Sequence, residues 1–243
     1  MTAQKSIQWR RVLVEASAIV LSILLAFSIE AWWAESQERG VEQQALASLR
    51  SDFGESRETL SFVLQIYEQS QAEFVRFQSS TPSELSSLDS DAIGAMVTAF
   101  TVAATFDPWA STLDALVRDG RLGLISDLAL RESLSTWLRA LEDIGENGLD
   151  IRSGATRVLR AMEAHGGPFQ NPGPTPGATR RRAVDLHMLP TADGSTLSAL
   201  RQDSSFVGMT RSHQFAVALY LRELNEIASI LDSTLALIEK SIR

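Results

Sequence analysis

The sequence has no cysteine and only three histidines among its 243 residues. Without cysteine, disulfide bonds, thiol chemistry and thiolate metal sites are all excluded. The histidines, His165, His187 and His213, are scattered, and none lies three or four residues from another. Two histidines of one helix need that spacing to bind zinc together. The sequence therefore predicts no metal site and no cofactor.

Motifs of catalysis are missing too. The sequence contains neither a G-x-S-x-G nucleophile motif nor a glycine-rich phosphate-binding loop. Carboxylates are plentiful, but most fall on the polar faces of expected helices, where solvation accounts for them. We therefore predict that the protein is not an enzyme and has no catalytic residues.

Strand patterns are absent, and proline is rare over most of the chain. Five of the seven prolines lie in residues 166–194, a stretch with few residues able to form a core. Elsewhere no segment alternates apolar and polar residues as a strand does. We expect an all-α fold in which an N-terminal membrane helix continues into an antiparallel helical bundle, with a long Pro/Gly-rich loop at 166–194.

One long apolar run is present, near the N-terminus. Residues 12–33 are nearly all apolar, and as a helix these 22 residues extend roughly 33 Å, enough to cross a hydrocarbon core of about 30 Å. We expect a single transmembrane helix there. Residues of the kind that anchor a helix at the lipid–water interface flank it, namely Trp9, Arg10, Arg11, Trp32 and Trp33.

The charges on either side of this run predict its orientation. Three basic residues precede it, and two acidic residues follow it before the next basic one. The positive-inside rule then places residues 1–11 in the cytoplasm and residues 34–243 outside it. The alternative is a signal peptide cleaved near Ala26-Phe27-Ser28. Glu15 counts against that alternative because it interrupts the apolar region.

Two carboxylates and a ladder of small residues lie within the span. Glu15 and Glu30 fall between the flanking tryptophans, where an ionised side chain costs free energy. Ala18, Ser22 and Ala26 follow each other at four-residue spacing, which lets two helices approach closely in lipid. We interpret these five residues as a transmembrane helix–helix interface. Alternatively the carboxylates reach the headgroups, with Glu15 paired to the arginine one turn back.

The rest of the chain is acidic. Three of the 22 basic residues precede the span and two of the 30 acidic residues lie within it, so the remainder has 19 basic and 28 acidic residues, a net charge of about −9. That charge argues against nucleic acid as a partner. The sole basic cluster is Arg180, Arg181 and Arg182, which either docks an acidic partner or lies in a solvated loop.

A heptad pattern follows the span. It predicts a long amphipathic helix that continues the membrane helix through Gly40 to about residue 79. The stripe joins two chains in a coiled coil or forms the core face of a bundle helix, and its aromatic residues and two serines favour the bundle. Its members are Leu46, Leu49, Phe53, Ser56, Leu60, Val63, Tyr67, Ser70, Phe74 and Phe77.

Capping signals predict the remaining helices. The N-caps we expect are Asp89 or Ser90, Asp107 with Pro108 after it, and Ser126. Further helices are expected within 83–106, at 109–119, from 127 to 165, from Ser195, and from Ser204 to Ile242. The apolar residues expected for the last helix are Phe215, Leu219, Leu224, Ile227, Leu231, Leu235 and Ile238.

Two blocks of the sequence carry a resemblance. The first runs from Glu15 to Trp33 and ends Glu-Ala-Trp-Trp, followed by Gln37-Glu38-Arg39 and an Ala-Leu-x-x-Leu run. The second, Trp109 to Asp127, contains T-x-x-x-L-x-x-x-G-x-L-x-L-I. Together they resemble a family of bacterial single-span membrane proteins known only as a domain of unknown function. The resemblance implies a bacterial inner-membrane protein with an exported helical domain, and it supplies no activity.

These observations favour a non-catalytic, membrane-anchored interaction protein. It would be an accessory subunit of a larger respiratory, photosynthetic or transport complex, or a homo-oligomeric scaffold, with other transmembrane helices and the bilayer as its partners. One alternative is an oligomeric ion or proton pathway lined by Glu15. Another is an extracytoplasmic ligand sensor, which the short cytoplasmic segment disfavours.

Overall fold

The computed structural model describes residues 9–165 and 193–242. Over these residues the chain is helical and contains no strand, which confirms the all-α class. The expected loop at 166–194 lies almost entirely outside the described residues. The elements are α1 (Trp9–Ser79), α2 (Pro82–Ser86), α3 (Ser90–Thr101), α4 (Ser111–Arg118), the 3₁₀ turn η1 (Leu122–Leu124), α5 (Leu128–Ala164), α6 (Gly194–Gln202) and α7 (Ser204–Ile242).

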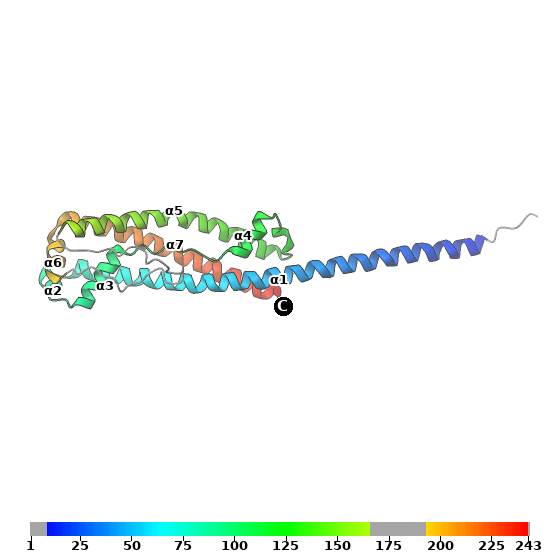
Figure 1. Ribbon diagram of the computed structural model, residues 1–243, viewed down its shortest axis with the longest axis horizontal. Coiled ribbons are helices and arrows are strands. Elements are labelled where there is room, and N and C mark those ends of the chain that lie inside the picture. The colour runs from blue at the N-terminus through cyan, green and yellow to red at the C-terminus, as the bar shows by residue number, and fades with distance from the viewer. Residues whose placement is uncertain (1–8, 166–192, 243) are drawn as a thin grey trace, which may run out of the picture.

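Three long helices form the bundle, and the first half of α1 projects from one end of it (Figure 1). Helix α7 runs antiparallel to α1, as the pairing of Arg57 with Asp232 and of Gln71 with Gln214 shows. It is also antiparallel to α5, because Ser133 at the start of α5 contacts Thr234 near the end of α7. Helices α1 and α5 are therefore parallel, and the chain between them returns along the length of the bundle.

Each long helix buries one stripe at heptad spacing. All ten heptad residues expected on α1 are buried, and they pack against the other helices of this chain. The bundle interpretation of that stripe is thus confirmed for α1. The stripe of α7 is equally regular and comprises Phe206, Thr210, His213, Val217, Tyr220, Leu224, Ile227, Leu231, Thr234 and Ile238.

Two of the apolar residues expected in α7 do not face the core. Phe215 is 66% exposed and Leu219 is 37% exposed. The buried residues beside them are His213, Val217 and Tyr220. The sequence misleads because a polar histidine occupies the heptad position, while a phenylalanine lies two residues away on the outer face.

The two serines in the α1 stripe bind the returning chain. Residues 102–110 are not helical, so their backbone groups need partners outside themselves. The Ser56 hydroxyl accepts a hydrogen bond from the Trp109 N–H at 2.9 Å, and the Tyr67 hydroxyl donates to the Ala104 carbonyl at 2.6 Å. The Ser70 hydroxyl donates to the Ala99 carbonyl at 2.7 Å. Polar side chains inside the bundle therefore stabilise a non-helical segment packed against it.

Two expected N-caps were wrong. The helix expected to start after Asp107 and Pro108 begins only at Ser111, and its cap residue makes no side-chain hydrogen bond. Asp52 of α1 replaces the cap, because its carboxylate accepts hydrogen bonds from Ser111 Oγ at 3.0 Å and from Thr112 N–H at 2.8 Å. A residue about 60 positions away cannot be recognised as a cap from local sequence.

The start of α5 shows the same effect on a smaller scale. Asp127, not Ser126, caps the helix, with its carboxylate accepting from the Ala129 N–H at 2.8 Å. Ser126 instead donates from both its N–H and its hydroxyl to Glu42 of α1, each at 2.6 Å. The expected cap at Asp89 is confirmed, and the expected helix end at Gly120 coincides with its positive φ of 66°.

Candidate functional site

Residues 19–41 of α1 lie outside the bundle core. From residue 19 to residue 41 every side chain is exposed, and Leu24, Phe27 and Ile29 are 56%, 64% and 57% exposed. Among the described residues α1 is the one helix long and apolar enough to cross a membrane. In Figure 1 this half extends as a single rod away from the bundle. Because the rod is apolar on all sides, it is the first candidate for a functional surface.

The polar groups of the rod that the structure describes are consistent with a membrane environment. The Ser28 hydroxyl donates to the carbonyl of Leu24 at 2.8 Å, so its donor is satisfied within the helix. Glu35 and Arg39 pair one turn apart just beyond Trp33. Charged side chains therefore resume where the apolar stretch ends.

The structure locates only some of the residues that the sequence singles out. Ser22, Ala26, Glu30, Trp32 and Trp33 are all exposed on the rod. The two tryptophans, 64% and 61% exposed, lie at the end of the apolar stretch nearest the bundle. The structure does not describe the side chains of the other residues that the sequence singles out. These are Trp9, Arg10, Arg11, Glu15, Ala18, Arg180, Arg181 and Arg182.

Because α1 is unbroken through Gly40, the orientation of the small-residue ladder relative to the bundle can be derived. Residues 18 apart in an α-helix lie on nearly the same line, since 18 residues make about five turns. Ser22 is therefore in line with Gly40, and Ala26 with Gln44, both of them exposed. The ladder points away from the bundle core.

The opposite face of the rod follows the buried stripe. By the same spacing Ser28 is in line with Leu46 and Ala31 with Leu49, and both leucines are fully buried. A neighbouring helix lying against Ser28 and Ala31 would meet the bundle at residue 46. One lying against Ser22 and Ala26 could pass along the outer surface of α1.

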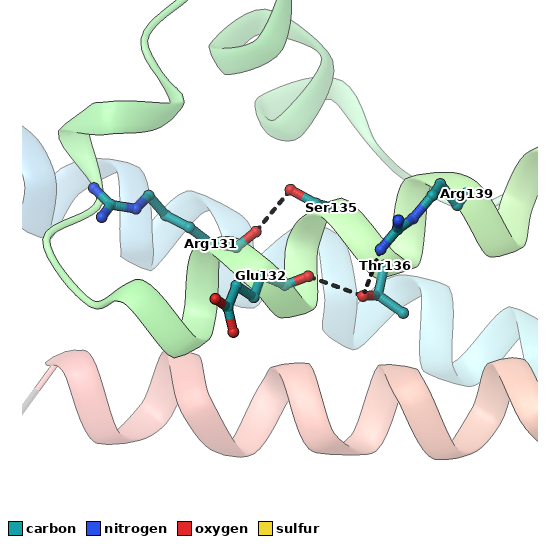
Figure 2. A pocket seen from close by; sticks show the side chains of 5 residues that line it. All are labelled: Arg131, Glu132, Ser135, Thr136 and Arg139. Carbon is teal, nitrogen blue, oxygen red and sulfur yellow. Dashed lines mark hydrogen bonds between the residues drawn. The ribbon is translucent and has the colours of Figure 1, made fainter.

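Helix α5 carries a surface depression of about 370 Å³ near its N-terminal end. Figure 2 shows its five lining residues, Arg131, Glu132, Ser135, Thr136 and Arg139, which all come from one helix. Their hydrogen bonds stay local: the Ser135 and Thr136 hydroxyls donate to carbonyls one turn back at 2.9 and 3.0 Å. Arg131 donates to the Ile125 carbonyl at 3.1 Å. The arrangement contains no nucleophile hydrogen-bonded to a base.

His213 is a buried residue of the α7 stripe. It is 2% exposed, lies edge-on to Phe74 at 5.7 Å between ring centroids, and neither ring nitrogen has a hydrogen-bond partner among the described residues. Burial, with a smaller contribution from Arg157, lowers the pKa of His213 to about 4. The ring is therefore neutral near pH 7 and packs as part of the core.

Gly154 of α5 makes room for this ring. A Cβ at Gly154 would overlap His213 Nδ1, so only glycine fits without a shift of the neighbouring helix. Sequence reasoning missed this contact, and a glycine in the middle of a long helical pattern was the available signal.

The other described histidine, His165, lies directly after α5, at the start of the connection to α7. His165 Nε2 is 3.1 Å from a carboxylate oxygen of Asp203. In the described part of the chain, no group of three histidines and carboxylates is placed to hold a metal ion. His187 lies outside that part.

Comparisons with known proteins add no relative. The resemblance of the two sequence blocks to a bacterial single-span family therefore stays a prediction. A scan against protein-family models, a search of curated proteins and a search of solved structures each found no match to this chain.

Proposed function

We propose that the protein is a non-catalytic, membrane-anchored interaction protein. Its span packs against other transmembrane helices, either as an accessory subunit of a larger membrane complex or in a homo-oligomeric scaffold. The N-terminus lies in the cytoplasm and the bundle outside it, which in a bacterium means the periplasm. The resemblance stated above is consistent with a bacterial inner membrane.

The observation that carries this proposal is the exposed face of α1 that contains Ser22 and Ala26. Apolar side chains of the rod are covered by nothing in the part of the chain that the structure describes, so lipid or other helices would cover them. In lipid, helices associate through close van der Waals packing, for which small residues are favoured. A ladder that faces away from the bundle lets a partner approach without steric conflict.

The unbroken helix adds a second argument. Between Trp33 and Leu46 the chain contains no flexible linker, because α1 is continuous. The bundle is therefore held at a fixed distance and orientation from the span. Such a rigid connection suits a protein that positions partners, since contacts in the membrane and contacts outside it keep a constant geometry.

The test replaces the small residues of one face. The double variant Ser22→Leu/Ala26→Leu places bulky side chains on the proposed contact face, and the control Ser28→Leu/Ala31→Leu places the same side chains on the other face. Complex size is measured in mild detergent by size exclusion with light scattering. We expect the first variant to give a smaller particle and the control to match the wild type. An unchanged size for the first variant contradicts the proposal.

Orientation can be tested with introduced cysteines, because the native chain has none. Ser51→Cys lies on the exposed surface of the bundle, and Thr2→Cys precedes the span. A membrane-impermeant maleimide applied to spheroplasts should label position 51 and leave position 2 unlabelled until the cells are lysed. The reverse pattern would show that the bundle is cytoplasmic.

A further inference from the structure

The second half of α5 carries three arginines on its outer surface, Arg152, Arg157 and Arg160. All three are exposed. With Leu149, Ser153 and Thr156 they line a shallow, open depression of about 410 Å³. Leu149 is 63% exposed, so the depression combines cationic groups with an apolar side chain. We refer to these six residues as the arginine face.

The arginines of this face differ from two arginines of α1. Arg57 of α1 pairs with Asp232 at 2.9 Å, and Arg50 of α1 pairs with Glu239 at 3.5 Å, both across the contact with α7. Within the described residues none of the three arginines of the arginine face forms an ion pair. Arg157 donates only to the Ser153 hydroxyl, at 3.2 Å.

The sequence that follows α5 is itself more basic than acidic. Residues 166–192 contain three arginines and one aspartate. The six residues of the arginine face carry three positive charges and no negative one on a protein whose net charge is −8, and the exposed carboxylates Asp150 and Glu163 border the face on the same helix. Unpaired guanidinium groups with hydroxyls between them offer several donors to a carboxylate-bearing surface.

We infer that the arginine face docks an acidic helical segment of a partner protein. Arg152 and Arg160 are eight residues apart, which is about 12 Å along the helix. A facing helix that carries glutamates one turn apart presents carboxylates at about half that interval, so it can pair with arginines along the whole face. Leu149 adds an apolar contact that favours a protein surface over a free anion.

The position of the face excludes the membrane that holds the span. Gly154 lies beside His213, which contacts Phe74 of α1, so the arginine face is level with that part of α1. Phe74 is 41 residues beyond Trp33, or roughly 60 Å along the helix. Headgroups of the same bilayer do not extend that far. A small anion alone is poorly enclosed by so open a depression.

The experiment measures binding of two labelled helical peptides to the full-length protein in nanodiscs of uncharged lipid. One peptide has glutamate at every fourth position, and the other has glutamine at the same positions. The test variant is Arg152→Gln/Arg157→Gln/Arg160→Gln. The control variant Arg118→Gln/Arg121→Gln/Arg139→Gln removes three other exposed arginines and so changes the net charge equally. Circular dichroism checks that both variants fold.

We expect the glutamate peptide to bind the wild type, with an affinity that falls as salt rises, and to bind the test variant about tenfold more weakly. We expect the control variant to bind the glutamate peptide as the wild type does, which would show that the loss is local. We expect the glutamine peptide to bind weakly, which would show that binding depends on carboxylates. Equal loss in both variants would mean a net-charge effect and overturns the inference. It is also overturned if inorganic phosphate at millimolar concentration displaces the peptide, or if only vesicles of anionic lipid bind. The span variants leave this surface intact, so either proposal can fail without the other.

Discussion

The two halves of α1 are one continuous helix, yet they meet different surroundings. Before residue 42 apolar side chains occur on all sides and are exposed, as Leu24 and Phe27 show at 56% and 64%. After residue 45 most large apolar side chains lie in one buried stripe, as Phe53 and Leu60 show at 1% each, while Phe62 and Val75 are exceptions at 49% and 58%. The distribution of apolar residues around the helix, more than their number, therefore indicates whether lipid or protein covers them.

The largest difference in stability between the two halves should appear when one phenylalanine is truncated in each. Phe53→Ala leaves a cavity beside Trp137, whose ring centroid is 5.2 Å from that of Phe53, and we expect it to lower the free energy of unfolding by about 3–5 kcal/mol. Phe27→Ala in the exposed half should change it by less than about 0.5 kcal/mol. Denaturant unfolding of the full chain in detergent, followed by circular dichroism, gives both values. Similar losses in the two variants would mean that the exposed half belongs to the folded core.

Acid should destabilise the bundle through His213. In the unfolded chain this histidine has a pKa of about 6.5, and in the folded bundle its pKa is about 4. As the pH falls from 6.5 to 4, the unfolded state binds a proton that the folded state does not, so the free energy of unfolding falls, by about 3 kcal/mol in total. Below pH 4 this group contributes no further loss.

The comparison variant for this pH effect is His213→Leu, which replaces the histidine of the stripe by an apolar side chain of moderate size that does not titrate. Its stability should lose the pH dependence between 6.5 and 4 that the wild type shows. If wild type and variant have parallel pH profiles, the titration of His213 does not control acid stability.

A glycine from inside the bundle can be compared with one outside it. Gly154→Ala places a methyl group against the His213 ring, and we expect a loss of about 1–3 kcal/mol in the free energy of unfolding. Gly40→Ala has no atom within 4 Å of its new Cβ, so it should favour the helix by up to about 1 kcal/mol. Melting temperatures of the two variants should therefore move in opposite directions, and a rise for Gly154→Ala would refute the close approach of α5 and α7.

The smallest effect concerns one carboxylate in each half. Asp52→Ala removes the acceptor for the Ser111 hydroxyl and the Thr112 N–H, which should cost about 1 kcal/mol. Glu35→Ala removes only the exposed pair with Arg39, so we expect no measurable change in the free energy of unfolding. Hydrogen exchange of the α4 amides should rise in the Asp52 variant alone. Unchanged protection there would show that Asp52 does not cap α4.

Patterns with a strict period made the helices predictable. The ten heptad positions of α1 and the bounds of α7, Ser204 to Ile242, follow from spacing and local signals, and the structure agrees with them. The serines at positions 56 and 70 looked like defects in a coiled-coil stripe, and their hydrogen bonds to the returning chain explain why they are there.

What failed depends on contacts between distant residues. The cap of α4 comes from Asp52 and the partner of Ser126 is Glu42, so neither could be read from the residues near these helix starts. Phe215 is apolar but exposed, while the neutral His213 takes the buried position with Gly154 opposite it, and the residue types alone do not predict this. The candidate interaction face was proposed from the ladder and the two carboxylates of the span, and the direction of the ladder relative to the bundle became known only through the unbroken helix.

The continuity of α1 has a mechanical consequence. Its 71 residues form a rod of roughly 107 Å, so turning the N-terminal end about its axis turns the bundle through the same angle. Inserting one residue near position 41 would rotate the arginine face by about 100° relative to the exposed rod while moving it only about 1.5 Å along the helix axis. Two molecules bound at opposite ends of this helix would therefore keep a fixed rotational orientation relative to each other about the helix axis.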